Sequence, residues 1–297
     1  MSIVIARKFG ERIVIASDTM ISDTDVTQTN KLPGRIKSVV IDLRISICYA
    51  GPANQSIDEI RKCKQKWDKN KSITELYEAL KISSHVHKSD YIIISHIDGV
   101  QIRKITNGTI SNDVENAYIG DSHIVKMIFD VEKNMYKDQN YDFSGFVTSD
   151  EECFRNSFLE LFRKNGTLIN RAVGGIAIFL LGSPYGHTYD SYATMQAWDI
   201  VYFNKPISDQ QMADRASGLT QWSVNVQSTT LRGAAVVSAI ITTAGIGYIY
   251  SPLESDEAIK IILPIADAKN PSTILRLVQN EANARAARLG GISVDPI

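Results

Sequence analysis

The sequence predicts an α+β protein built in layers, with helices packed on buried sheets. Continuous apolar runs, typical of strands that are buried on both faces, occur in groups. Amphipathic segments with apolar residues every three or four positions separate these groups. The order reads strands, two helices, strands, two helices, strands, which favours an αββα layering over the strict strand–helix alternation of a doubly wound sheet.

The composition places the chain among soluble globular proteins. It has 297 residues, enough for about two domains. Hydrophobic residues make up 44% and charged residues 22%, which excludes a disordered chain and a disulfide mini-protein. The net charge of -1 gives no general basic field, so we expect neither nucleic acid nor an acidic membrane as a partner.

The cysteines and the apolar segments indicate a cytoplasmic protein. Cys48, Cys63 and Cys153 are an odd number without metal-type spacing, and they are typical of reduced thiols. The first residues lack the apolar core of a secretory signal. The longest uncharged run, 233–253, contains glycines and many β-branched residues, so we expect buried strand there and no membrane helix.

The first half of the chain contains the clearest elements. Apolar runs predict strands at 3–6 and 13–16, and the pair 35–41 and 45–50 is spaced as a hairpin. Apolar residues at helical spacing predict helices over 55–66 and 73–82. Strands at 91–95 and 100–105 flank the turn dipeptide Asp98-Gly99.

The second half continues the alternation and then changes character. We expect helices at 122–134 and 150–164, the latter capped by Ser149 with Glu152 three residues on, and then a strand at 176–181. His187 falls in a segment rich in Gly and Tyr, which reads as a loop.

Two domains are expected, 1–200 and a strand-rich extension, 201–297. Within the extension the sequence predicts a short helix at 209–217, strands within 224–250 and at 259–263, and a final helix over 271–289. Whether the extension packs on the first domain is left open.

Four blocks, in the right order over about residues 2–185, resemble the proteasome β subunits and the bacterial proteasome-like peptidases. They are 2–18 (SIVIARKFGERIVIASD), Arg35-Ile36-Lys37 through Tyr49-Ala50-Gly51, Asp98-Gly99 through Tyr118-Ile119-Gly120, and Val173-Gly174-Gly175. The resemblance implies the four-layer αββα sandwich of the N-terminal-nucleophile (Ntn) hydrolases, followed here by a C-terminal extension.

The same resemblance implies a set of site residues. Ser2 would be the nucleophile, Asp18 would orient a basic residue, and the Gly51 N–H would stabilise the oxyanion. The basic residue is Lys37 if positions are counted back from Gly51, and Arg35 if they are counted forward from Asp18. These two lie two apart on the expected strand, so both would face the same side. Lys31 is a weaker third choice.

An N-terminal serine carries its own base, the free α-amine, whose pKa of about 7.7–8.0 leaves a useful neutral fraction at pH 7. Because Met1 is followed by a small residue, we expect its removal, which exposes the Ser2 amine. The implied reaction needs no cofactor and no metal. The spacing His85-x-His87 has no carboxylate or cysteine nearby that would complete a metal site.

Several supporting positions depart from the family pattern. The nucleophile is Ser and not Thr, and the remaining changes are Gly120-Asp121-Ser122 for Ser-x-Gly, Asn170 for Asp, Val173 for Ser, and Pro52 after the oxyanion glycine.

These departures leave alternatives open. The first is a peptidase or amidohydrolase acting on peptides or small amides, a homo-oligomer that assembles into rings and can work with an unfoldase. The second is a catalytically inactive structural subunit of a ring or larger particle. The third is an α+β binding module whose resemblance is accidental.

Overall fold

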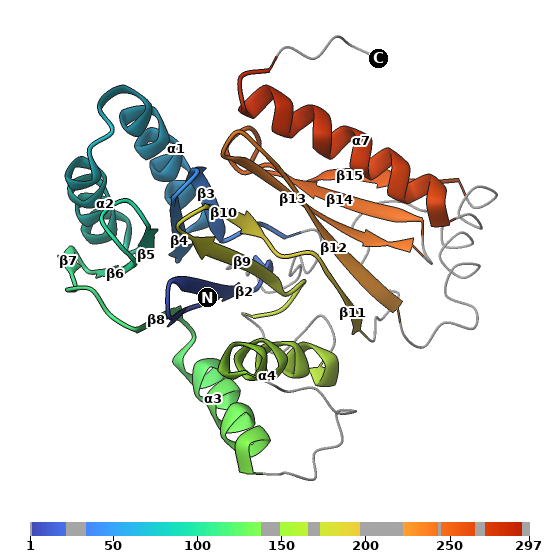
Figure 1. The fold of residues 1–297 in the computed structure, drawn as a ribbon, viewed down its shortest axis with the longest axis horizontal. Helices are drawn as coiled ribbons and strands as arrows, with labels where there is room; N and C mark the ends of the chain where they lie inside the picture. Colours follow the sequence, from blue (N-terminus) through green and yellow to red (C-terminus); the bar gives the residue numbers. More distant parts are fainter. Residues whose placement is uncertain are drawn as a thin grey trace.

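The computed structural model describes residues 2–21, 34–137, 149–165, 173–196, 222–242, 245–264 and 271–292. Within these ranges the chain forms three five-stranded antiparallel sheets and five helices (Figure 1). We name the sheets A, B and C in the order in which the chain first enters them. The predicted mixture of strands and helices is thus confirmed, and the α-helices lie outside the sheets.

Sheet A holds the first two strands of the chain at its centre. Its order is β10-β9-β2-β1-β8, with bounds Gly186–Tyr189, Ile178–Ser183, Arg12–Ser17, Ile3–Phe9 and Asn116–Gly120. The β1–β2 hairpin turns at Gly10-Glu11 and pairs Phe9 with Arg12. On its other side β1 pairs with β8, which places Ile3 opposite Gly120.

Sheet B has the order β3-β4-β5-β6-β7. The strands are Ser38–Asp42, Ile45–Ala50, Asp90–Ser95, Gln101–Thr106 and Thr109–Ile110. The predicted hairpin is confirmed, but β3 begins at Ser38 and not at Arg35. The reason is local: Gly34 has φ +65°, and the Arg35 N–H donates to Thr19 O, after β2, at 2.6 Å. Contact with sheet B is made at Lys37, whose carbonyl accepts a hydrogen bond from the Tyr49 N–H of β4 at 2.9 Å.

Four helices cover the outer faces of these two sheets. Helices α1 (Ala53–Asn70) and α2 (Ile73–His87) pack on sheet B, and α3 (Ser122–Lys137) and α4 (Asp150–Asn165) pack on sheet A (Figure 1). The Ser149 Oγ accepts a hydrogen bond from the Glu152 N–H at 3.2 Å, which confirms the predicted cap of α4. Ser72 caps α2 in the same way.

The third sheet is formed by one strand that lies before residue 200 and four strands of the extension. Sheet C has the order β11-β12-β13-β14-β15, with bounds Tyr192–Gln196, Trp222–Leu231, Ala234–Ile241, Ile246–Tyr250 and Ile259–Ile262. Helix α7 (Pro271–Leu289) covers its outer face (Figure 1). The contact is close, since a Cβ on Gly247 would lie 2.2 Å from Val278 Cγ2.

All three sheets contribute to one central core, which we define as the buried cluster between them. Sheet A supplies Val4 and Ile15, sheet B supplies Ile92, and sheet C supplies Val237 and Tyr248. The extension therefore packs on the rest of the chain. The expected boundary near residue 200 and the expected helix 209–217 lie outside the described residues.

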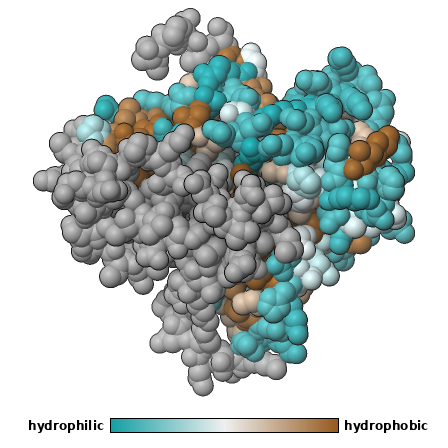
Figure 2. Space-filling model, turned by 180° about the vertical axis from the view of Figure 1, so that it is seen from behind, coloured by the Kyte–Doolittle hydropathy of each residue, from teal (hydrophilic) through white to brown (hydrophobic). Residues whose placement is uncertain are grey.

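The apolar run 233–253 forms β13 and β14, so the prediction of buried strand is confirmed. Among the described residues there is no helix with the length and apolar character needed to cross a membrane. The face behind Figure 1 is mostly hydrophilic over α1 and α2, with small hydrophobic patches (Figure 2). The three cysteines are buried, and none of them forms a disulfide.

Candidate functional site

The candidate site lies where three segments that are distant in sequence meet. Ser2 precedes β1, Asp18 follows β2, and Lys37 precedes β3. Because β1 and β2 are antiparallel, the start of one lies beside the end of the other. The Ile3 N–H donates to Asp18 Oδ1 at 3.0 Å, and the Asp18 N–H donates to Ile3 O at 3.3 Å. The Asp18 carboxylate is thus fixed one residue away from Ser2.

Lys37 and Asp18 form a buried ion pair. The Lys37 Nζ lies 2.5 Å from Asp18 Oδ1 and donates a second hydrogen bond to Met20 O at 2.7 Å. Their side chains are only 3% and 0% exposed. A buried charge is costly unless it is paired and hydrogen-bonded, and here both conditions are met. The family resemblance implies a site role for both Asp18 and Lys37, and the structure places their side chains in contact.

Burial and pairing act on this pair in opposite directions. Burial lowers the pKa of Lys37, and the Asp18 carboxylate opposes that shift. Burial likewise raises the pKa of Asp18, while the Lys37 ammonium and two backbone N–H donors oppose it. We take the pair as ionised, because every one of these hydrogen bonds is of the kind that favours the charged form.

The glycine pair after the fourth helix contributes to the same site. The Gly174 N–H donates to Asp18 Oδ2 at 3.2 Å, so both carboxylate oxygens are engaged. Two further bonds tie this segment to the end of β2: Met20 N–H to Gly174 O at 3.1 Å, and Ile176 N–H to Thr19 Oγ1 at 2.9 Å. No local pattern assigns Gly174 to a site, and its position in the fourth resembling block is the signal that could have done so.

Ser2 is buried, at 5% exposure, and its backbone is held by the end of β8. Its carbonyl accepts a hydrogen bond from the Asp121 N–H at 2.8 Å. Gly120 has φ +96°, and a Cβ there would lie 1.8 Å from Ser2 O. Only glycine fits at this position. Met1 and Lys31 lie outside the described residues.

The structure gives Arg35 and Lys37 different partners. The Arg35 guanidinium donates to Asn54 Oδ1, in the first turn of α1, and not to Asp18. The expectation that both residues lie on a strand is wrong, because β3 begins at Ser38. Lys37 binds Asp18 instead. Gly51 lies just before α1 with φ +120°, and a Cβ there would lie 3.1 Å from Lys88 O.

A second buried polar cluster lies at the other end of β1 and β2. His187 Nδ1 lies 2.8 Å from Ser46 Oγ, and its Nε2 lies 2.8 Å from His96 Nδ1. The His96 Nε2 lies 3.1 Å from Glu11 O. A carbonyl can only accept, so the His96 Nε2 carries a proton, the His187 Nε2 donates to His96, and the Ser46 hydroxyl donates to His187. Both rings are neutral in this arrangement.

The sequence interpretation missed this cluster, since His187 was expected in a loop. It lies instead on β10 and is buried. Burial lowers the pKa of His187 to about 3 and also lowers that of His96. No group of three or more potential metal ligands occurs among the residues that the structure describes.

No family model and no curated protein matches the chain. Among solved structures, the chain is similar to eukaryotic HslV from Trypanosoma brucei, with 14% sequence identity and a TM-score of 0.44. The similarity covers 61% of this chain and 99% of the HslV chain. The function is therefore inferred from this chain's own residues and their geometry.

Proposed function

We propose that the chain is an N-terminal-nucleophile amide or peptide hydrolase of the proteasome-like class, which uses Ser2 after Met1 is removed. The observation that supports this most is the Asp18 carboxylate, which binds Lys37, Gly174 and the N–H next to Ser2. Sheets A and B with their four helices then correspond to an αββα sandwich, and sheet C with α7 to an addition.

The proposed reaction uses groups of this chain alone. The Ser2 amine takes the hydroxyl proton while Oγ attacks the substrate carbonyl, and the Gly51 N–H stabilises the oxyanion. The protonated amine then gives its proton to the leaving nitrogen as the C–N bond breaks, which leaves an ester on Ser2. The same amine takes a proton from water as the water oxygen attacks the ester carbon. It then gives that proton to Oγ as the ester C–O bond breaks, which releases the acid and restores the Ser2 hydroxyl.

Lys37, rather than Arg35, fits the role of the basic residue in this proposal. A buried ammonium near the Ser2 amine would lower the pKa of that amine, and this keeps more of it neutral at pH 7. Asp18 positions the ammonium through its 2.5 Å contact. Arg35 is engaged with Asn54.

The first test is chemical labelling of the purified protein after intact-mass measurement and N-terminal sequencing. If the chain begins at Ser2, a hydroxyl-directed electrophile such as a β-lactone should acylate that residue alone, as mapped by peptide mass spectrometry. The labelling rate should rise with pH as the amine loses its proton. Ser2→Ala should abolish labelling, and Lys37→Met should slow it by about 10²-fold or more.

Ser72 offers a matched control, because Ser72→Ala removes a hydroxyl at the N-cap of α2 and should leave labelling unchanged. A free Ser2 amine without labelling at any pH would refute the hydrolase proposal.

The alternative is a catalytically inactive proteasome-fold subunit of a ring or larger particle, and retention of Met1 in the mature protein would favour it. Its structural support is that segment 251–258 lies against the flank of the site and leaves little free space there. In either case we propose that the protein is cytoplasmic and forms a homo-oligomer. Native mass spectrometry would measure the number of subunits. Peptide or small-amide substrates, and an unfoldase partner, belong to the first proposal.

A further inference from the structure

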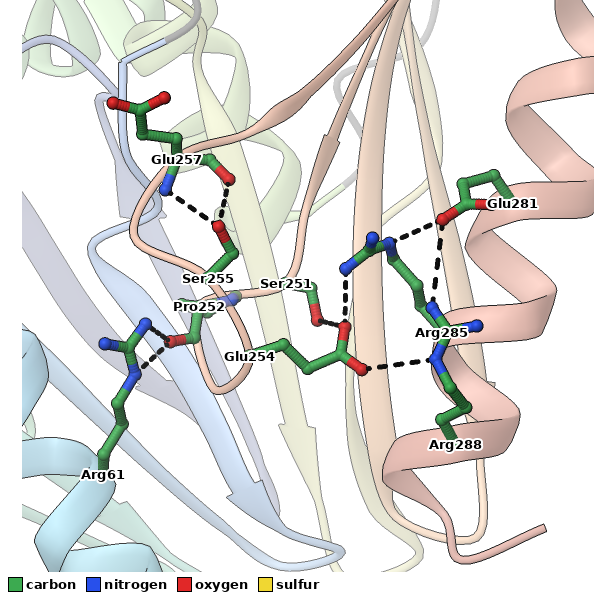
Figure 3. Close-up of polar contacts among 9 residues, drawn as sticks. All are labelled: Arg61, Ser251, Pro252, Glu254, Ser255, Glu257, Glu281, Arg285 and Arg288. Carbon is green, nitrogen blue, oxygen red and sulfur yellow. Dashed lines mark hydrogen bonds and ion pairs between the residues drawn. The ribbon is translucent and has the colours of Figure 1, made fainter. Parts of the chain in front are cut away.

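The segment Ser251–Ala258, which we name the strap, joins β14 to β15 and crosses from sheet C to α1 (Figure 3). Arg61 of α1 holds it from one side. The Arg61 Nε and Nη2 donate to Pro252 O at 3.0 and 2.8 Å, and Nη1 lies 2.7 Å from Asp256 Oδ1. One side chain therefore binds the strap at two points.

Helix α7 holds the strap from the other side (Figure 3). The Glu254 Oε2 lies 2.8 Å from Arg285 Nη1 and accepts a hydrogen bond from Ser251 Oγ at 2.8 Å. Arg285 in turn donates to Glu281 at 2.8 Å. The strap is thus clasped between α1 and α7 by charged groups.

Beneath the strap lies the flank of the candidate site. A gap there is lined by the strap and by Arg35, Ile36, Tyr49 and Ile57. Ile36 precedes Lys37 in the chain, and the Tyr49 N–H donates to Lys37 O at 2.9 Å, so this gap borders the segment that carries the lysine. Its volume of about 10 Å³ has room for about one water molecule.

The gap contains an unsatisfied polar group. Tyr49 is 1% exposed, and its hydroxyl has no hydrogen-bond partner among the residues that the structure describes. Burial raises the pKa of Tyr49, the Arg35 guanidinium opposes that shift, and the Asp256 carboxylate adds to it. A buried hydroxyl without a partner is costly, and a water or a polar group of a ligand would satisfy it.

We propose that the strap is a cover over the candidate site, closed in this structure, and that it must leave α1 before a peptide or amide side chain can enter beside Lys37. This inference rests on the proposed hydrolase function. Release of the contacts of Arg61 with the strap would widen the gap and free Tyr49 to contact a substrate.

The test removes the contacts of Arg61 with Pro252 and Asp256, which we name the Arg61 clasp, and measures how often the strap leaves α1 without any assay of catalysis. Arg61→Met keeps the hydrocarbon stem but loses all three contacts to the strap. Lys62→Met is the matched control, because Lys62 is its neighbour on α1 and pairs only with Glu59 of the same helix among the described residues. Hydrogen exchange of the 251–258 amides and nitration of Tyr49 by tetranitromethane, mapped by mass spectrometry, report the opening.

We expect both rates to rise by at least about tenfold in Arg61→Met and to stay unchanged in Lys62→Met. If Arg61→Met does not fold, Asp256→Asn removes the ion pair alone and should give a smaller rise of the same sign. Equal rates in all variants, or rapid nitration of Tyr49 in the wild type, would contradict the proposal that the strap is a cover.

Labelling of Ser2 by the β-lactone separates this inference from the proposed function. A parallel rise in opening and labelling supports both. Opening with an unchanged, non-zero labelling rate overturns the cover and leaves the hydrolase standing. Opening with no labelling of a free Ser2 in any variant refutes the hydrolase, and with it the role of the strap as a cover over an active site.

Discussion

At the scale of residues, the Asp18–Lys37 pair combines a structural and a proposed chemical role. Both side chains are inaccessible to water, so each charge depends on the other and on nearby backbone groups. Such pairs contribute little compared with a well-packed apolar pair, but the loss of one partner leaves an uncompensated charge. This asymmetry can be measured separately from any activity.

Lys37→Met should lower the free energy of unfolding by about 3–5 kcal/mol, because the Asp18 carboxylate loses its counter-ion in a buried place. The double variant Asp18→Asn with Lys37→Met should recover part of this loss, since no buried charge then remains. Urea denaturation of both proteins measures the difference. A double variant less stable than Lys37→Met alone would contradict a charge-based explanation.

The His96–His187 pair predicts acid sensitivity. The folded-state pKa of His187 is about 3, below the value of about 6.5 for a free histidine, so the unfolded chain binds more protons between these values. The neutral His187 therefore makes its full contribution to the free energy of unfolding above about pH 6.5. This contribution falls as the pH decreases through this window, by up to about 1.4 kcal/mol per pH unit for one proton.

The check compares unfolding free energies at pH 7.5 and pH 5.0. Because His187→Gln removes the titrating ring, that protein should lose less stability on acidification than the wild type. His123 is exposed at the start of α3, and His123→Gln should follow the wild type. An identical pH response in all three proteins would show that the buried pair does not carry the effect.

At the scale of elements, the end of β8 determines where the chain places Ser2. Gly120 and Gly99 have similar φ angles, +96° and +92°, but of the two only Gly120 would place a Cβ within 4 Å of another group. Gly99→Ala should cost about 1–3 kcal/mol from backbone strain alone. Gly120→Ala should cost roughly 2 kcal/mol more, because it displaces Ser2.

Hydrogen exchange along the β1–β8 ladder provides the second readout. It should increase in Gly120→Ala, whereas Gly99→Ala should leave it unchanged. If the two variants lose equal free energy of unfolding and equal protection from hydrogen exchange, the close contact between position 120 and Ser2 O does not contribute to stability.

The elements differ in how well local sequence predicts them. Helices α1, α2 and α4 follow from apolar spacing and, for α4, from the Ser149 cap. Strands β10 and β11 are not predicted, because each is only four or five residues long and has no continuous apolar run. They are ordered by pairing with β9 and β12. Residues 35–37 have a strand-like composition, yet the Arg35 N–H binds Thr19 O and the strand itself begins only at Ser38.

The candidate site also contains parts that the sequence predicts and parts that it does not. Asp18 and Lys37 come together through the meeting of two hairpins, and only the family resemblance pointed to that pairing. Their chemical roles, with those of Ser2, Gly51 and Arg35, stay predictions. His96 and His187 are 91 positions apart, and no local pattern could bring them together.

At the scale of the whole molecule, two buried polar clusters lie at opposite ends of the β1–β2 hairpin. One includes Asp18 beside the start of β1, and the other contacts Glu11 at the turn. The central core lies between sheets A, B and C. The extension is part of this core, and its strap reaches the flank of the candidate site.

This shared core predicts that the extension and sheets A and B unfold together. Val237, on the inner face of sheet C, is 0% exposed and belongs to the same cluster as Cys48 of β4. Val237→Ala should cost roughly 2 kcal/mol. If unfolding is one cooperative event, the slowest-exchanging amides of β13 and β4 should lose equal free energies of protection in this variant.

Val278→Ala, in the outer cluster under α7, is the companion variant. It should also lower protection in β4, because in a single cooperative event α7 and sheet C unfold only together with sheets A and B. Loss of protection confined to β13 and α7 in both variants would mean that the extension unfolds alone. The strap could then leave α1 by unfolding of the extension, and breaking the Arg61 clasp would not be required.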